Sequence, residues 1–130
     1  MNKKLLIAGS FLGIIGIILG AWAAHGLEKL VDENAVKSFE TGVRYQMYHA
    51  FLLLLLGGTT FINLKVKKVV FYLVLLGVFL FSGSIYGLST NTIYSFNFEI
   101  FAILTPFGGL SLIIAWIVML IGILKTKDDN

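Results

Sequence analysis

Four long apolar blocks constrain this chain more than any other feature of its sequence. They cover residues 5–24, 43–64, 69–88 and 106–124. Each is close to the ~20 apolar residues with which a helix crosses a hydrocarbon core about 30 Å thick. Only 13% of the residues are charged, about half the share found in soluble domains. The 130 residues suffice for one domain, so the sequence predicts an all-α polytopic membrane protein, a single bundle of four transmembrane helices.

The first apolar block allows two interpretations. Two lysines, an apolar stretch and then Ala21-Trp22-Ala23 resemble a signal peptide with its cleavage site. The apolar stretch is longer than a typical signal sequence, and glycines recur through it at helical spacing. We therefore favour a first helix that is retained.

The distribution of cationic residues predicts the orientation. With the N-terminus inside, seven of them fall in cytoplasmic segments: Lys3, Lys4, Lys65, Lys67, Lys68, Lys125 and Lys127. Only Lys29, Lys37 and Arg44 fall outside. This asymmetry predicts that both termini are cytoplasmic. The cationic residues sit at helix ends and form no basic stripe, so we expect no nucleic-acid binding. The chain has no cysteine, which excludes disulfides and thiolate chemistry.

The second helix is predicted to start well before it enters the membrane. Asp32 is a suitable N-cap, and Glu33 suits the positive end of the helix dipole. Charges then recur at Lys37, Glu40 and Arg44 at spacings of three and four, which places alternating signs on one helix face. We expect one continuous helix that is amphipathic outside and enters the membrane near Arg44.

The start of the fourth helix is harder to predict, because residues 96–125 are too many for one perpendicular crossing. Thr105 as a cap and Pro106 as the first helical residue would solve this. Residues 106–124 then form a helix of about 28 Å, which matches the hydrocarbon core. Residues 91–104 would be an outer connection. The alternative is a longer helix that is kinked at Pro106.

Small residues recur at helical spacing and predict close contacts between helices, because small side chains let backbones approach in lipid. A substrate groove beside flexible backbone is the other interpretation, and we favour packing. The predicted packing glycines are Gly9, Gly13, Gly16, Gly20, Gly83, Gly87, Gly108 and Gly109.

Four motifs occur in order along the chain: GAWAAHGL (residues 20–27), YQMYHA (45–50), FSGSIY (81–86) and TPFGG (105–109). Together they closely resemble a family of small bacterial membrane proteins known as domain of unknown function 423. Its usual forms look like GAFGAHGL, YQMYHA, FSGSLY and TPIGG. Here Trp22 and Ala23 replace the usual aromatic residue and glycine, and Phe107 replaces an aliphatic residue. The resemblance implies a four-span fold in a bacterial plasma membrane and brings no activity with it.

Polar residues of these motifs are predicted to lie at the outer membrane level, where they would form a collar. Its members are His25, Arg44, Tyr45, Tyr48, His49, Ser82, Ser84, Tyr86 and Thr105. The collar can be a shallow pocket or a hydrogen-bond network that ties the helix ends together. His49 is the most unusual member, because an ionisable group inside a span is costly. Gln46 and Met47 give no separate signal.

The function that this sequence favours is a helix bundle that interacts with lipid or with a membrane partner. The expected partners are membrane lipids, with a second copy or another membrane protein as alternatives. A small-solute or proton-coupled transporter that uses His49 is the second hypothesis, although the apolar cores hold no Asp or Glu. An enzyme is not expected, nor is a cofactor or metal site, because there are only two histidines and no nucleophile motif.

Overall fold

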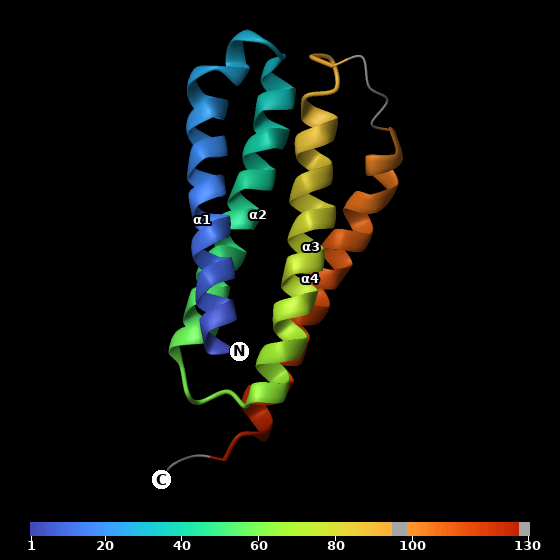
Figure 1. The fold of residues 1–130 in the computed structure, drawn as a ribbon. Helices are drawn as coiled ribbons and strands as arrows, with labels where there is room; N and C mark the ends of the chain where they lie inside the picture. The colour runs from blue at the N-terminus through green and yellow to red at the C-terminus, as the bar shows by residue number, and fades with distance from the viewer. Residues whose placement is uncertain (95–98, 128–130) are drawn as a thin grey trace.

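A computed structural model describes residues 1–94 and 99–127 of the chain, and within these ranges it has four long helices and one 3₁₀ turn (Figure 1). Their bounds are Asn2–His25 for α1, Leu27–Lys29 for η1, Glu33–Gly58 for α2, Leu64–Ser89 for α3 and Glu99–Lys125 for α4. Three stretches are long and apolar enough to cross a membrane, namely Asn2–Lys29, Leu64–Ser89 and Glu99–Lys125. The prediction of an all-α, polytopic membrane protein is confirmed.

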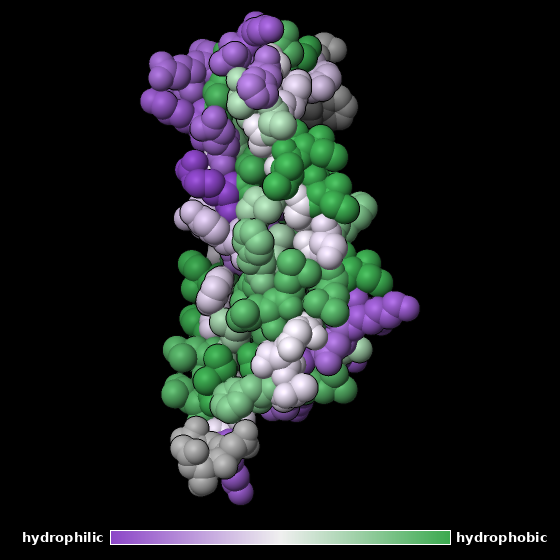
Figure 2. Space-filling view, turned by 90° about the vertical axis from the view of Figure 1, so that its left-hand side faces the viewer, coloured by the Kyte–Doolittle hydropathy of each residue, from purple (hydrophilic) through white to green (hydrophobic). Residues whose placement is uncertain are grey.

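The helices follow one another up and down, each packed on the next: α1 on α2, α2 on α3, and α3 on α4. The N-terminus and the last turn of α4 lie at one end of the molecule, here called the terminal end (Figure 1). The η1 turn and the last turn of α3 lie at the opposite end, here called the η1 end. Figure 2 shows hydrophilic residues gathered at the η1 end and an extended apolar surface below it. Exposed apolar side chains such as Phe11, Ile14 and Ile18 on α1 suit contact with lipid.

Polar caps set where two helices begin. The side chain of Asp32 accepts a hydrogen bond of 2.8 Å from the Ala35 backbone N–H, which confirms the predicted N-cap. The charged segment and the apolar segment therefore belong to one helix, as predicted. Asn63 caps α3 in the same way, with 2.9 Å to the Val66 N–H. The lysines that follow Asn63 lie in the first turns of α3 rather than in a loop.

The predicted start of the fourth helix was wrong. The α4 helix begins at Glu99, and Pro106 lies inside it. Thr105 does not cap a helix, since its hydroxyl donates to the Phe101 carbonyl at 2.7 Å. A proline removes one backbone N–H from the helix, and membrane helices tolerate this loss when neighbouring groups satisfy the freed carbonyl. Residues 99–104 are therefore helical rather than part of a connection, and residues 95–98 lie outside the described ranges.

Two apolar clusters form the core. The larger one joins residues of all four helices, with Leu5, Leu53, Val74 and Leu112 as buried members. The smaller one lies where η1 meets α2, and it centres on Phe39. The ring of Phe39 packs on Trp22 (centroids 5.6 Å apart) and on Tyr86 (4.7 Å). Aromatic packing thus closes the η1 end.

The α3 and α4 helices approach each other closely at Gly108. A methyl group added there would overlap backbone atoms of Leu80 and Phe81, which cannot move independently of the helix. A methyl group on Gly77 would lie 3.1 Å from the Gly108 carbonyl oxygen. The Ser111 hydroxyl also donates to the Leu73 carbonyl at 2.8 Å. Small residues therefore let these two helices touch along their backbones.

The other predicted packing glycines differ in their surroundings. Gly9 and Gly16 face α2 too closely for a methyl group, while Gly20 and Gly109 have ordinary van der Waals distances to their neighbours. The prediction of a packing role is wrong for Gly13 and Gly83. Apart from its own helix, no described residue lies within 4 Å of a methyl group placed on either glycine. Gly13 is rotated about 60° from Gly16 around the helix axis. Gly83 borders a hollow of 170 Å³ between α3 and α4, which diverge toward the η1 end (Figure 1). Gly87 is half-buried.

We predict that Gly108→Ala lowers the free energy of unfolding by about 1–3 kcal/mol, because the new methyl group overpacks the contact with α3. Gly109→Ala is the matched control, since its methyl group would sit 3.6 Å from the Phe81 ring. We expect that control to change stability by less than about 0.5 kcal/mol. Unfolding of the detergent-solubilised protein by SDS provides the measurement. Equal effects of the two substitutions would contradict the contact.

Candidate functional site

His49 is buried, with 3% of its surface exposed, and both of its ring nitrogens are hydrogen-bonded. Nδ1 lies 2.6 Å from the Tyr45 carbonyl oxygen. Nε2 lies 3.1 Å from the indole nitrogen of Trp116 on α4. Since the indole N–H can only donate, Nε2 accepts and Nδ1 carries the proton that is donated to Tyr45. The arrangement therefore fits a neutral imidazole that bridges α2 and α4.

A hollow of 300 Å³ adjoins this bridge, and we call it the lateral groove. Side chains of α2, α3 and α4 line it: Tyr45, His49, Phe81, Gly109, Leu112, Ile113 and Trp116. Ile113 is 58% exposed and Trp116 46% exposed, so the groove opens sideways onto the apolar surface. Its walls are mainly apolar and aromatic, and its few polar groups are the Tyr45 hydroxyl and the His49–Trp116 pair. Such a lining suits an elongated apolar ligand.

Gln46 forms a second connection, which links three helices. Its side chain is buried, its Nε2 donates to the Leu12 carbonyl on α1 at 2.8 Å, and its Oε1 accepts from the Tyr86 hydroxyl on α3 at 2.7 Å. One turn away, the Ser82 hydroxyl donates to the Gly42 carbonyl at 2.7 Å. These bonds stabilise the packing of α1, α2 and α3 in surroundings where an unpaired polar group is costly.

The predicted collar members divide among separate places rather than forming one ring. Tyr86 and Ser82 join Gln46, whereas His49 and Tyr45 belong to the lateral groove. Ser84 is buried at the 170 Å³ hollow between α3 and α4.

The remaining collar members lie apart from both groups. His25 is exposed at the end of α1, and the Thr105 hydroxyl is bonded within its own helix. Arg44 is exposed and donates to the Thr41 hydroxyl at 2.8 Å. Tyr48 is 54% exposed, with its ring 5.6 Å from that of Tyr45. Tyr48 thus lies next to Tyr45 of the lateral groove, and Arg44 lies on the surface of α2 one turn before Tyr48.

Lys67 lies at the terminal end. It was expected to be an exposed lysine at a helix end, but its side chain is buried. Only 3% of its surface is exposed. Its ammonium group donates to Asn2 Oδ1 at 2.9 Å and to the Thr59 carbonyl. It therefore ties the start of α1 to the connection between α2 and α3.

Sequence reasoning missed Gln46, Trp116 and Lys67. Only the position of Gln46 relative to its neighbours could have pointed to it, since it lies four residues after Gly42 and three before His49 and so shares their side of the helix. Trp116 gave none, because a tryptophan in an apolar block is ordinary. Among the residues that the structure describes, no three His, Cys, Asp or Glu side chains are grouped as metal ligands would be.

We predict that Gln46→Leu destabilises the protein by about 1–3 kcal/mol, because it removes the bond to the Leu12 carbonyl and takes away the acceptor of the Tyr86 hydroxyl. Combining it with Tyr86→Phe should cost less than the sum of the two single changes, since both remove the same bond. SDS-induced unfolding of the four proteins of this cycle tests the coupling. Strict additivity would mean that the Gln46–Tyr86 bond contributes nothing.

Comparisons with known proteins agree with the motifs. The profile of a family described as protein of unknown function (DUF423) matches residues 19–109. A UPF0382 membrane protein of Staphylococcus haemolyticus is 36% identical over 126 residues, covering 95% of this chain and 97% of the relative. UPF0382 membrane protein YwdK of Bacillus subtilis is 34% identical over 128 residues, which cover 95% of this chain and 98% of the relative.

A third relative, UPF0382 inner membrane protein YgdD of Escherichia coli, is 32% identical over 130 residues, covering 97% of this chain and 93% of the relative. No solved structure matches the chain. The resemblance found in the four motifs is confirmed. The chain belongs to the DUF423 (UPF0382) family of multi-pass membrane proteins.

Proposed function

We propose that the chain crosses a bacterial cell membrane four times and has both termini in the cytoplasm. The α1, α3 and α4 helices are apolar enough to span, whereas the outer half of α2 carries charges. However, α2 is packed between α1 and α3 and returns the chain from the η1 end to the terminal end (Figure 1). If its neighbours span, α2 spans with them. Lys65, Lys68 and Lys125 at the terminal end favour a cytoplasmic location of that end.

Single cysteines test this topology, because the natural chain has none. We expect Lys29→Cys in η1 to react with a membrane-impermeant maleimide on intact cells. Thr60→Cys, in the connection after α2, and Lys127→Cys should react only after permeabilisation. Labelling of Thr60→Cys on intact cells would show that α2 does not cross.

We propose further that the protein binds a membrane lipid, with an acyl chain in the lateral groove. The observation that carries this proposal is a 300 Å³ hollow with apolar walls that opens sideways between α2 and α4. A chain of CH₂ groups gains free energy by filling such a space, through contacts that lipid packed outside the groove does not make. Tyr48 is exposed beside the groove residue Tyr45, and Arg44 is exposed one turn earlier on α2. A guanidinium and a phenol suit the phosphate and interfacial part of a lipid.

The same geometry gives no support to the transporter hypothesis. Both nitrogens of His49 are already bonded, so uptake of a proton would break its bond with Trp116. The sequence also has no Asp or Glu between residues 41 and 98, which leaves the apolar part of α2 and the whole of α3 without a carboxylate for ion coupling. We propose neither transport nor catalysis, and we propose no cofactor.

Filling the groove tests lipid binding. We predict that Ile113→Trp lowers the amount of phospholipid that copurifies per protein in mild detergent at least about threefold, because the larger side chain occupies the space of the acyl chain. Ile114→Trp is the control, since Ile114 is exposed on the same helix and does not line the groove. Quantitative lipid mass spectrometry makes the comparison. Equal lipid retention by both variants and the natural protein would contradict the proposal.

A further inference from the structure

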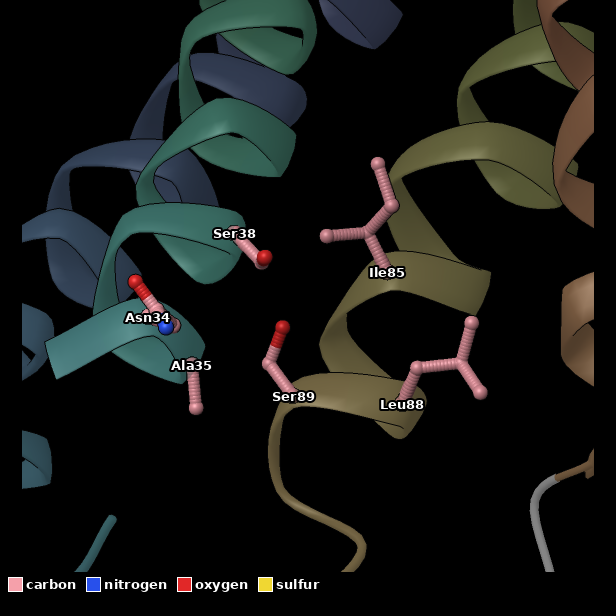
Figure 3. A pocket seen from close by; sticks show the side chains of 6 residues that line it. All are labelled: Asn34, Ala35, Ser38, Ile85, Leu88 and Ser89. Carbon is pink, nitrogen blue, oxygen red and sulfur yellow. The ribbon is translucent and has the colours of Figure 1, made fainter. Parts of the chain in front are cut away.

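A second pocket lies between the first turns of α2 and the last turns of α3, and we call it the hydroxyl pocket. It measures 270 Å³ and is lined by Asn34, Ala35, Ser38, Ile85, Leu88 and Ser89. Figure 3 shows the hydroxyl groups of Ser38 and Ser89 pointing into the space between the two helices. Ser89 is only 6% exposed. Its Oγ is the one buried side-chain polar atom, among the described residues, that has no hydrogen-bond partner.

An unpaired hydroxyl at the base of a pocket indicates that the occupant is polar, because a buried polar group is ordinarily hydrogen-bonded. The polar side chains that line the pocket are one amide and two hydroxyls, and within residues 1–94 and 99–127 no charged side chain lines it. Each of these groups can both donate and accept, so their natural complement is another hydroxyl group. The nearest charges along α2, Glu33 and Lys37, are paired with each other at 3.5 Å and exposed. The lining therefore favours a neutral ligand over an ion.

The size of the pocket limits the ligand further. At ~30 Å³ per water molecule, 270 Å³ holds a group of roughly six to nine non-hydrogen atoms. A glycerol group or part of a sugar ring has this size and carries several hydroxyls. The apolar side chains of Ile85 and Leu88 can cover its carbon atoms.

The hydroxyl pocket lies along the same seam as the lateral groove. On α2, Ser38 and Tyr45 are two turns apart on one face, which is about 10 Å along the helix axis. On α3, Phe81 of the groove and Ile85 of the pocket are one turn apart. One lipid molecule can therefore reach both spaces, with its acyl chain in the groove and its headgroup nearer the η1 end.

We propose that the hydroxyl pocket receives the glycerol or sugar headgroup of the lipid held in the lateral groove, and that a headgroup hydroxyl bonds to Ser89. This inference rests on the lipid binding proposed above and names the class of lipid. Lipids whose headgroups carry no hydroxyl lack the groups that this pocket complements.

A lipid competition tests the proposal with the full-length protein in detergent. The two lipids are phosphatidylglycerol and phosphatidylmethanol with identical acyl chains, which carry the same charge and differ in the glycerol group. Native mass spectrometry measures the bound ratio. We expect a preference of about fivefold for phosphatidylglycerol, the ratio that corresponds to one hydrogen bond. In Ser89→Ala the ratio should fall to about one, because binding of phosphatidylglycerol weakens to the level of phosphatidylmethanol, whose own binding should not change. Ser10→Ala, a change of an exposed serine on α1, should keep the preference.

The outcomes separate this inference from the function on which it rests. Binding of neither lipid would contradict lipid binding itself. Equal binding of both by the natural protein, or a preference that Ser89→Ala retains, would overturn the headgroup assignment alone and leave a pocket that holds only water. A thermal shift with soluble glycerol that Ser89→Ala abolishes would overturn the assignment to a lipid, and we expect no such shift.

Discussion

The hydrogen bonds of α2 to each of the other helices are the interaction on which the structure depends. Gln46 bonds to α1 and α3, and His49 bonds to α4. In a hydrocarbon environment a polar side chain must find its partner within the protein. The least apolar of the four helices is therefore also the one that is bonded to all the others. The α2 helix is not among the stretches that are apolar enough to span a membrane, whereas α1 and α3 are. These hydrogen bonds explain how α2 is held between them.

The four helices also form two closely packed pairs, α1 with α2 and α3 with α4. Gly9 and Gly16 bring α1 against α2, and Gly77 and Gly108 bring α3 against α4. Between the pairs, Gly42 of α2 faces the large ring of Tyr86 rather than backbone. The seam between the pairs is therefore filled by side chains, and it is where both the lateral groove and the hydroxyl pocket lie. A ligand can occupy this seam without separating either glycine-mediated contact.

The parts of the structure that depend on local sequence could be predicted, and those that depend on helix rotation could not. The lengths of the apolar blocks predicted the helices, and Asp32 predicted the start of α2. Both predictions succeed because hydropathy and helix caps depend on local sequence. The start of α4 was predicted wrongly at Pro106, because the preference of proline for the first position of a helix comes from soluble proteins. The polar residues were expected in one ring since their depth in the membrane can be read from the sequence. Their partners cannot, because the rotation of α2 about its own axis decides whether Gln46 faces α1 and α3 or lipid.

An experimental structure in phospholipid nanodiscs tests most directly the proposal that a lipid chain occupies the lateral groove. We expect continuous acyl-chain density beside Ile113 and Trp116, with headgroup density toward Ser89. A groove closed by side chains, or filled by a helix of a second copy, would contradict it.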